Sequence, residues 1–142
     1  MNISYSAIVL TEQDRDNLLA QLISMIPEGW DIVAHHMTIC MGPLIHPTKA
    51  SHNYSAFGEP GTPHRLQVTE VGMDNKAMAV KVISPAMTQN ESKGGFAHIT
   101  IAVNTAGGGK PFHSNKIPLQ NFEDISQLGI VVNGLVEEIP QP

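Results

Sequence analysis

The sequence has one cysteine, few aromatic residues and fewer basic than acidic side chains. Cys40 has no partner within the chain, so an internal disulfide is excluded, as is typical of proteins of the reducing cytoplasm. Lys and Arg number 8 against 13 Asp and Glu, which gives a formal net charge of −5. Proteins that bind duplex nucleic acid need a basic surface to contact phosphates, so that class is excluded. A polyanionic substrate has to be small and held by local hydrogen-bond donors.

Long apolar runs are also missing, so we expect no membrane-spanning segment. The first ten residues lack the basic region and cleavage site of a signal peptide, and we therefore expect a cytoplasmic protein. The hydrophobic share of 42% and the charged share of 15% are typical of a globular chain, and 142 residues suit one domain over 1–142.

Hydrophobic periodicity predicts an α+β chain with one main helix. Leucines and isoleucines recur at helical spacing over 12–25, and Thr11 is the predicted N-cap, with Asp14 three residues later. Strands are predicted over 4–10, 31–41, 66–73, 76–83, 96–104 and 128–136. Asp74 and Asn75 form the turn of a predicted hairpin. The segment 43–63 is a predicted long surface loop, 84–95 is polar, and 107–111 is a flexible glycine-rich loop.

One short pattern, His-x-Thr-Ile, occurs twice and falls each time inside a predicted strand. It begins at His36 and again at His98. Because strand side chains alternate between faces, His36 and Thr38 share one face, and His98 and Thr100 share the corresponding face of the second strand. The opposite face of each strand is apolar and is expected to enter the core: Met37, Ile39 and Met41 in the first strand, Ile99, Ile101 and Val103 in the second. Small residues, Cys40 and Ala102, continue the two histidine faces.

Two histidines and two threonines on paired strands suit the cleavage of a phosphodiester. One imidazole takes a proton from the attacking oxygen, and the other gives a proton to the leaving oxygen. Threonine hydroxyls donate hydrogen bonds to the non-bridging oxygens, whose charge grows in the transition state. This scheme needs no metal or other cofactor. The alternative is that both histidines lie on the polar faces of amphipathic strands without a catalytic role.

The paired motif in a small α+β chain resembles the 2H phosphoesterase superfamily. The phage anti-CBASS nucleases, which degrade cyclic oligonucleotide signals, are similar in size, in the opening Tyr-containing strand, in the stretch from Trp30 to Ile39, and in the segment 98–104 with the Gly-rich Lys-Pro loop that follows it. The resemblance implies two-lobed antiparallel sheets around a central cleft. It also implies a catalytic set of His36, Thr38, His98 and Thr100 and a 3′–5′-linked cyclic di- or trinucleotide substrate. Which histidine is the base stays open, as does the oligomeric state, with a homo-oligomer possible.

Three further residues are candidates for substrate binding. Tyr5 is predicted to stack on a base, or else to belong to the core. Lys110 and Ser114, with the amides of 107–109, are predicted to form a phosphate-binding nest, or else a mobile loop. The loop 43–63 contains His46, His52, Tyr54 and Phe57 and is a candidate lid, while His113, Trp30, Glu137 and Glu138 are weaker candidates.

Three other functions compete. A metal site would use His35, His36, Cys40 and His46, although adjacent histidines of a strand point to opposite faces. A non-catalytic protein would sequester a cyclic nucleotide. An RNA 2′,3′-cyclic phosphodiesterase would use the same four residues on another substrate.

Overall fold

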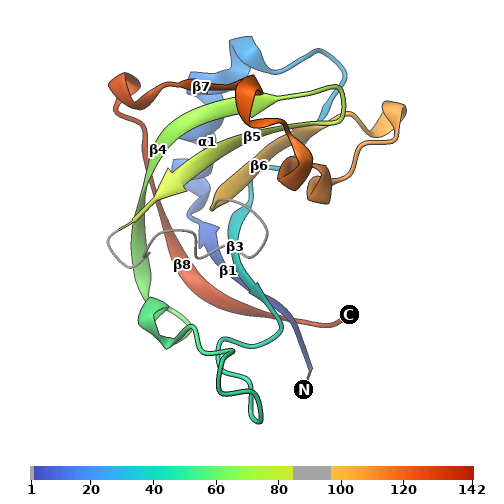
Figure 1. Cartoon of the computed structure of the whole chain (residues 1–142). Helices are drawn as coiled ribbons and strands as arrows, with labels where there is room; N and C mark the ends of the chain where they lie inside the picture. The colour runs from blue at the N-terminus through green and yellow to red at the C-terminus, as the bar shows by residue number, and fades with distance from the viewer. Residues whose placement is uncertain (1, 85–96) are drawn as a thin grey trace.

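The sheet of this protein curves round on itself (Figure 1). A computed structural model describes residues 2–84 and 97–142. Its strands are β1 (Ile3–Leu10), β2 (Asp31–Ile32), β3 (His36–Met41), β4 (Pro63–Met73), β5 (Ala77–Ile83), β6 (His98–Val103), β7 (Phe122–Asp124) and β8 (Val131–Pro140). Its α-helix is α1 (Glu12–Leu22). Most of the predicted polar segment 84–95 and the first residue of the predicted strand 96–104 lie outside the described residues.

Six of the strands form a closed antiparallel barrel. Their order is β6-β3-β1-β8-β4-β5, and pairing between β5 and β6 closes the circle. Two short strands extend it, β2 beside β6 and β7 beside β4. The predicted two-lobed sheets around a central cleft are therefore wrong. The physical reason is that the two motif strands pair with each other, so the sheet continues across the position where two lobes would separate.

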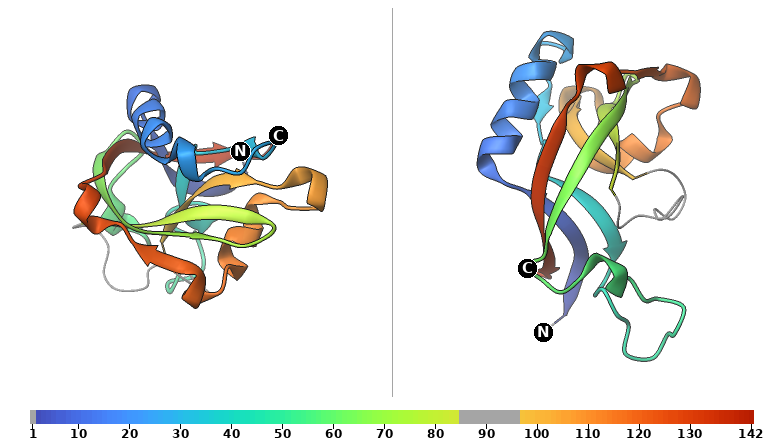
Figure 2. Two further views of the ribbon diagram at one scale, coloured as in Figure 1. Left: turned by 90° about the horizontal axis from the view of Figure 1, so that it is seen from above. Right: turned by 90° about the vertical axis from the view of Figure 1, so that its left-hand side faces the viewer.

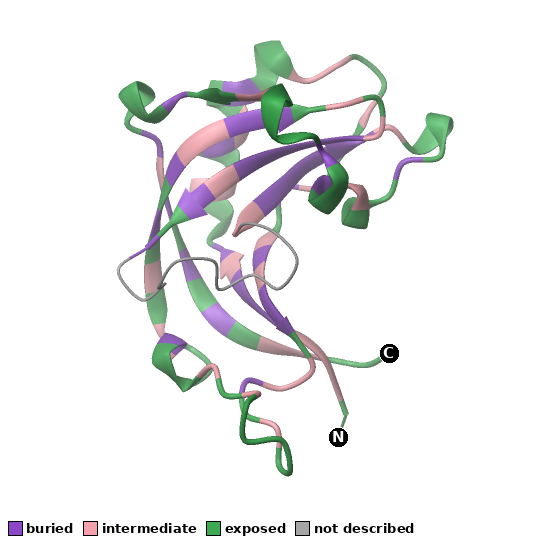
Figure 3. Cartoon of the chain, in the orientation of Figure 1, coloured by how far each residue is buried: buried purple, intermediate pink, exposed green. Residues whose placement is uncertain are grey.

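The barrel interior is the hydrophobic core. Ile8, Met37, Ile99 and Val80 pair in register across four consecutive strands, and each is almost completely buried. Cross-strand partners point to the same face, so these residues define the inward side. Alternation between buried and more exposed positions is visible along several strands in Figure 3. Met37 and Ile99 thus enter the core as the sequence predicts.

Helix α1 begins where the sequence predicts and ends earlier. Thr11 is the N-cap, and its Oγ1 accepts a hydrogen bond from the Asp14 amide at 3.3 Å. Leu18 and Leu22 are fully buried in the main core, and a 3-10 helix replaces the last predicted turn. The Asp14 carboxylate accepts hydrogen bonds from the backbone and side-chain amides of Asn133, at 2.6 and 2.8 Å. These bonds fasten the first helical turn to β8, and the helix lies beside the barrel in both views of Figure 2.

The predicted strand over 31–41 is interrupted. β2 ends at Ile32, and Ala34 adopts a positive φ of 40°, which non-glycine residues rarely adopt. The kink lets β3 begin afresh at His36. The hairpin of β4 and β5 is confirmed, and the carboxylate of Asp74 stabilises its turn by accepting bonds from the amides of Lys76 and Ala77.

A second layer covers part of the outer face of the barrel. Phe122 lies directly over Gly72 of β4, where a Cβ would come within 2.4 Å of the aromatic ring, so only glycine fits there. Ile117 packs on the outward alanines of β5, next to the 3-10 helix η4 (Pro111–Lys116). Among the helices in the described part of the chain, none is long and apolar enough to cross a membrane.

Candidate active site on the outer barrel wall

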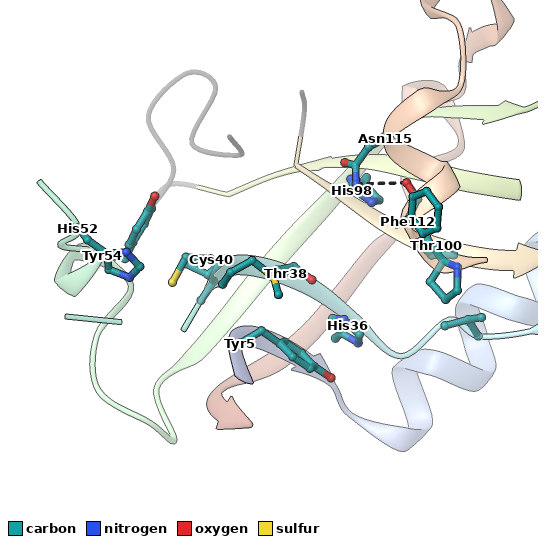
Figure 4. Close-up of a pocket in the computed structure, with 14 residues that line it drawn as sticks. Tyr5, His36, Thr38, Cys40, His52, Tyr54, His98, Thr100, Phe112 and Asn115 are labelled. Atoms are coloured by element: carbon teal, nitrogen blue, oxygen red, sulfur yellow. Dashed lines mark hydrogen bonds between the residues drawn. The ribbon is translucent and has the colours of Figure 1, made fainter. Parts of the chain in front are cut away.

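Neighbouring strands bring the two motifs together on the outer wall of the barrel. Met37 pairs with Ile99 in antiparallel strands. In each strand, the motif histidine precedes this paired residue and the motif threonine follows it. His36 therefore lies toward Thr100, and Thr38 lies toward His98. All four side chains are directed away from the core face that Met37 and Ile99 occupy. Figure 4 shows them around one pocket.

Each motif strand carries an irregularity at the isoleucine that follows the threonine. Ser6 pairs with Cys40 and Ala7 with Thr38, so Ile39 is the extra residue in β3. On the other strand, Met78 pairs with Ala102 and Ala79 with Thr100, so Ile101 is the extra residue in β6. Such bulges bend a strand and redirect the side chains that follow.

The bulges explain where simple alternation gives the wrong face. Met41, predicted to enter the core, is 70% exposed and lines the pocket. Ala102, predicted to face away from the core, is fully buried within it. The face assignments of the catalytic candidates survive because His36, Thr38, His98 and Thr100 all precede the bulge in their strand.

The pocket beside these residues has a volume of about 560 Å³, which is within the range of small-ligand sites. Its walls come from β1, β3, β6, the segment 43–57, hereafter the arm, and η4. The lining residues are Tyr5, Val33, His36, Thr38, Ile39, Cys40, Met41, His52, Tyr54, His98, Thr100, Pro111, Phe112 and Asn115. Every predicted catalytic residue is among them.

His36 has an unusual electrostatic environment. The pKa of its imidazole is lowered from 6.5 to about 4, chiefly because burial desolvates the ring and in smaller part by electrostatic interaction with His35 and His98. The Tyr5 ring lies 5.1 Å from the His36 ring, at an interplanar angle of 31°. The His36 imidazole is therefore neutral at pH 7 and can accept a proton.

Thr100 is held by a buried partner. Its Oγ1 lies 2.8 Å from Oγ of Ser114, which is completely buried, and 3.4 Å from the carbonyl oxygen of Pro111. The Thr100 hydroxyl has one proton to donate. If the Ser114 hydroxyl donates to Thr100, the Thr100 proton is shared only with a distant carbonyl and is available to a ligand in the pocket.

The arm corresponds to most of the predicted loop 43–63 and has internal order. Backbone bonds connect Leu44 with Tyr54 and His46 with His52. Oε2 of Glu138 on β8 accepts a hydrogen bond from the Leu44 amide at 3.0 Å. His52 and Tyr54 thus reach the pocket on a supported segment, whereas lid closure stays a prediction.

Of the three predicted substrate-binding residues, one lines the pocket and two do not. Tyr5 lines the pocket, but Lys110 and Ser114 are not among the described residues that do so. Lys110 is exposed, and the Ser114 hydroxyl is hydrogen-bonded to that of Thr100. The amides of 107–109 bond to oxygens of Asn104 and Thr105, so they are already used within their own turn and do not form an open nest.

Phe112 and Asn115 are pocket residues that sequence reasoning missed. Both lie on η4, which has no apolar periodicity to identify it, and Asn115 donates a hydrogen bond to the Phe112 carbonyl at 3.4 Å (Figure 4). Met41 was missed because of the bulge.

The described part of the chain contains no ligand cluster for the alternative metal site. Within 2–84 and 97–142, no group of three or more His, Cys, Asp or Glu is arranged to hold a metal ion. Burial raises the pKa of the Cys40 thiol, which disfavours the thiolate form that binds metals. The thiol instead lies near the carbonyl oxygens of Gly42 and Pro43.

No protein-family model matches this chain, and no curated protein does either.

Proposed function

We propose that this protein is a metal-independent phosphodiesterase of the 2H type that cleaves 3′–5′ linkages of cyclic oligonucleotide second messengers. One observation carries the proposal: both His-x-Thr motifs line the same pocket from adjacent strands. The resemblance to phage anti-CBASS nucleases supplies the substrate class and suggests a role in immune evasion within the bacterial cytoplasm. The barrel does not weaken the chemical argument, because a function depends on the geometry of its site and not on the fold class.

The surroundings of His36 suggest how the two proton transfers are divided. His36 is the general base, since its lowered pKa leaves the imidazole unprotonated at neutral pH. It takes the proton of a ribose 2′-hydroxyl, whose oxygen attacks the adjacent phosphorus. His98 is the general acid and protonates the departing 5′-oxygen, which leaves a 2′,3′-cyclic phosphate. An anionic phosphate in the pocket raises the pKa of His36 toward neutrality, which makes it a better base in the complex.

The threonines stabilise charge in this scheme. The hydroxyls of Thr38 and Thr100 donate hydrogen bonds to the non-bridging phosphate oxygens as negative charge develops there. Hydrogen bonds of this kind contribute more where water is partly excluded, and both threonines lie in a partly enclosed pocket. Tyr5, beside His36, is positioned to contact a base or ribose of the same ligand.

The test is a panel of cyclic dinucleotides, cyclic trinucleotides and RNA 2′,3′-cyclic phosphates, incubated with excess chelator and separated by chromatography. Wild type should cleave one class, and His36→Ala or His98→Ala should each reduce the rate by about 10²- to 10⁴-fold, the usual contribution of one acid or base. His64→Ala, on β4 and outside the pocket, is the matched control and should retain activity. A 2′-deoxy or 2′–5′-linked analogue at the scissile position should resist cleavage.

Other outcomes favour the alternatives. Cleavage of RNA 2′,3′-cyclic phosphates alone would make the protein an RNA-end phosphodiesterase with the same site. Tight binding of a cyclic nucleotide that returns intact from every incubation would make it a sequestering protein. Activity that chelator abolishes would contradict the metal-independent mechanism.

A further inference from the structure

His35 and His36 are consecutive residues, yet their rings meet. Nδ1 of His35 lies 2.9 Å from Nδ1 of His36, and the two rings are nearly perpendicular with centroids 5.1 Å apart. In a regular strand such neighbours would point to opposite faces. Here the positive φ of Ala34 precedes them, and β3 begins only at His36, so His35 is free of the strand alternation.

The backbone holds His35 in this position. Its carbonyl oxygen accepts a hydrogen bond from the Leu10 amide at 3.0 Å, at the end of β1. The His35 side chain is exposed, whereas His36 is half-buried and lines the pocket. The pair therefore connects the pocket wall to solvent through two imidazoles.

A contact between two Nδ1 atoms constrains both tautomers. A hydrogen bond needs one proton between the nitrogens, so one ring carries its proton on Nδ1 and the other presents a lone pair there. If His36 is the donor, its Nε2 has a lone pair free for the pocket, and His35 carries its proton on the exposed Nε2. If His35 is the donor, Nε2 of His36 is already protonated and cannot act as a base.

We propose that His35 is the positioning residue of the catalytic base, accepting the Nδ1 proton of His36 so that Nε2 of His36 faces the substrate with a lone pair. The proposal rests on the proposed function. When Nε2 accepts the 2′-hydroxyl proton, His36 becomes an imidazolium that still donates its Nδ1 proton to neutral His35. The proton returns from Nε2 to solvent or to the product, and His35 ends unchanged. This is the role of the third group that orients a base in other catalytic sets.

The other groups that face His36 do not supply this acceptor. Tyr5 of β1 approaches the His36 ring with its own ring, and His98 approaches from β6 as a second titratable imidazole. Protonation of His35 would remove the acceptor lone pair and place a positive charge beside His36. The orienting contact therefore requires a neutral His35.

Two variants separate positioning from packing. His35→Ala removes the acceptor, whereas the amide oxygen of His35→Asn can occupy a position near that of Nδ1. We expect His35→Ala to lower kcat by about 10- to 100-fold, the usual effect of losing an orienting partner, with little change in KM. His35→Asn should restore most of kcat. Equal kcat in all three proteins, or equal losses in both variants, would overturn the proposal.

A measurement without substrate keeps this inference separate from the proposed function. Nitrogen-15 NMR of the histidine rings at neutral pH should show His36 as the Nδ1–H tautomer in the wild type and as Nε2–H or a mixture in His35→Ala. A wild-type His36 in the Nε2–H form would refute the proposal even if the enzyme is active. A third outcome separates the two proposals. If the wild-type protein cleaves no substrate, but its His36 is in the Nδ1–H form and this form is lost in His35→Ala, then the orienting contact is supported and the catalytic function is refuted.

Discussion

Replacing His36 by glutamine should remove about 2 kcal/mol of pH dependence from the free energy of unfolding between about pH 7 and pH 5. The folded-state pKa of His36 is about 4, against an ordinary value of 6.5, chiefly because the ring is desolvated by burial. As the pH falls from 7, the unfolded chain binds a proton at His36 before the folded chain does. Stability from this group is complete above the unfolded pKa and is lost as the pH falls from 6.5 toward 4.

The magnitude follows from the two pKa values. A shift of one unit corresponds to about 1.4 kcal/mol, so the full difference approaches about 3 kcal/mol near pH 4, and about 2 kcal/mol has appeared by pH 5. That is a large part of the stability of a domain of this size, which is typically about 5–15 kcal/mol. Glutamine keeps a polar side chain but cannot bind the proton.

Urea unfolding followed by Trp30 fluorescence measures this effect. Trp30 is the only tryptophan and packs against the main core, so its emission reports loss of that core. The free energy of unfolding is measured over a series of pH values for the wild type and for His36→Gln. Every group except His36 titrates in both proteins, so the difference between the two series gives the contribution of His36. If the unfolding free energies of the wild type and of His36→Gln change in parallel from neutral pH down to about pH 5, the folded protein does not suppress protonation of this ring.

Two further predictions concern side chains that support the site and the barrel. Ser114→Ala should lower thermal stability by about 1–2 kcal/mol, because it removes a buried hydrogen bond to Thr100, and should lower kcat by more than the exposed control Ser24→Ala does. Wild-type kcat in Ser114→Ala would show that Thr100 needs no such support. Asp14→Ala should cost about 1–2 kcal/mol in chemical denaturation, since its carboxylate binds two amides of β8, whereas Asp16→Ala should cost less than about 0.5 kcal/mol because its ion pair is exposed. Equal losses in the two aspartate variants would mean that the tether to β8 contributes nothing.

Local chemistry made part of the site predictable. The alternation of side chains along a strand is a property of the backbone, so the sequence correctly put His36 and Thr38 on the face opposite Met37. The same reasoning failed one residue after each threonine, where a bulge inserts an extra residue. A bulge exists only relative to a partner strand, and the periodicity of one segment does not contain it.

The pairing of His35 with His36 illustrates the same limit at closer range. Their adjacency in sequence predicts opposite directions, but the kink at Ala34 and the backbone bond from Leu10 turn both imidazoles toward each other. Ser114 was predicted to touch substrate, and its position beneath Thr100 depends on how η4 packs on β6. Neither contact follows from composition or spacing.

The sequence by itself determined the helix that Thr11 caps, the hairpin of β4 and β5, and the two equivalent strands that carry histidine and threonine. Each depends on interactions within a few residues, which residue type and period encode. Only the tertiary structure decided that β5 pairs with β6 and that the sheet closes into a barrel instead of separating into lobes. Strand partners are chosen by which distant surfaces bury each other best, and that choice is made by the folded chain as a whole.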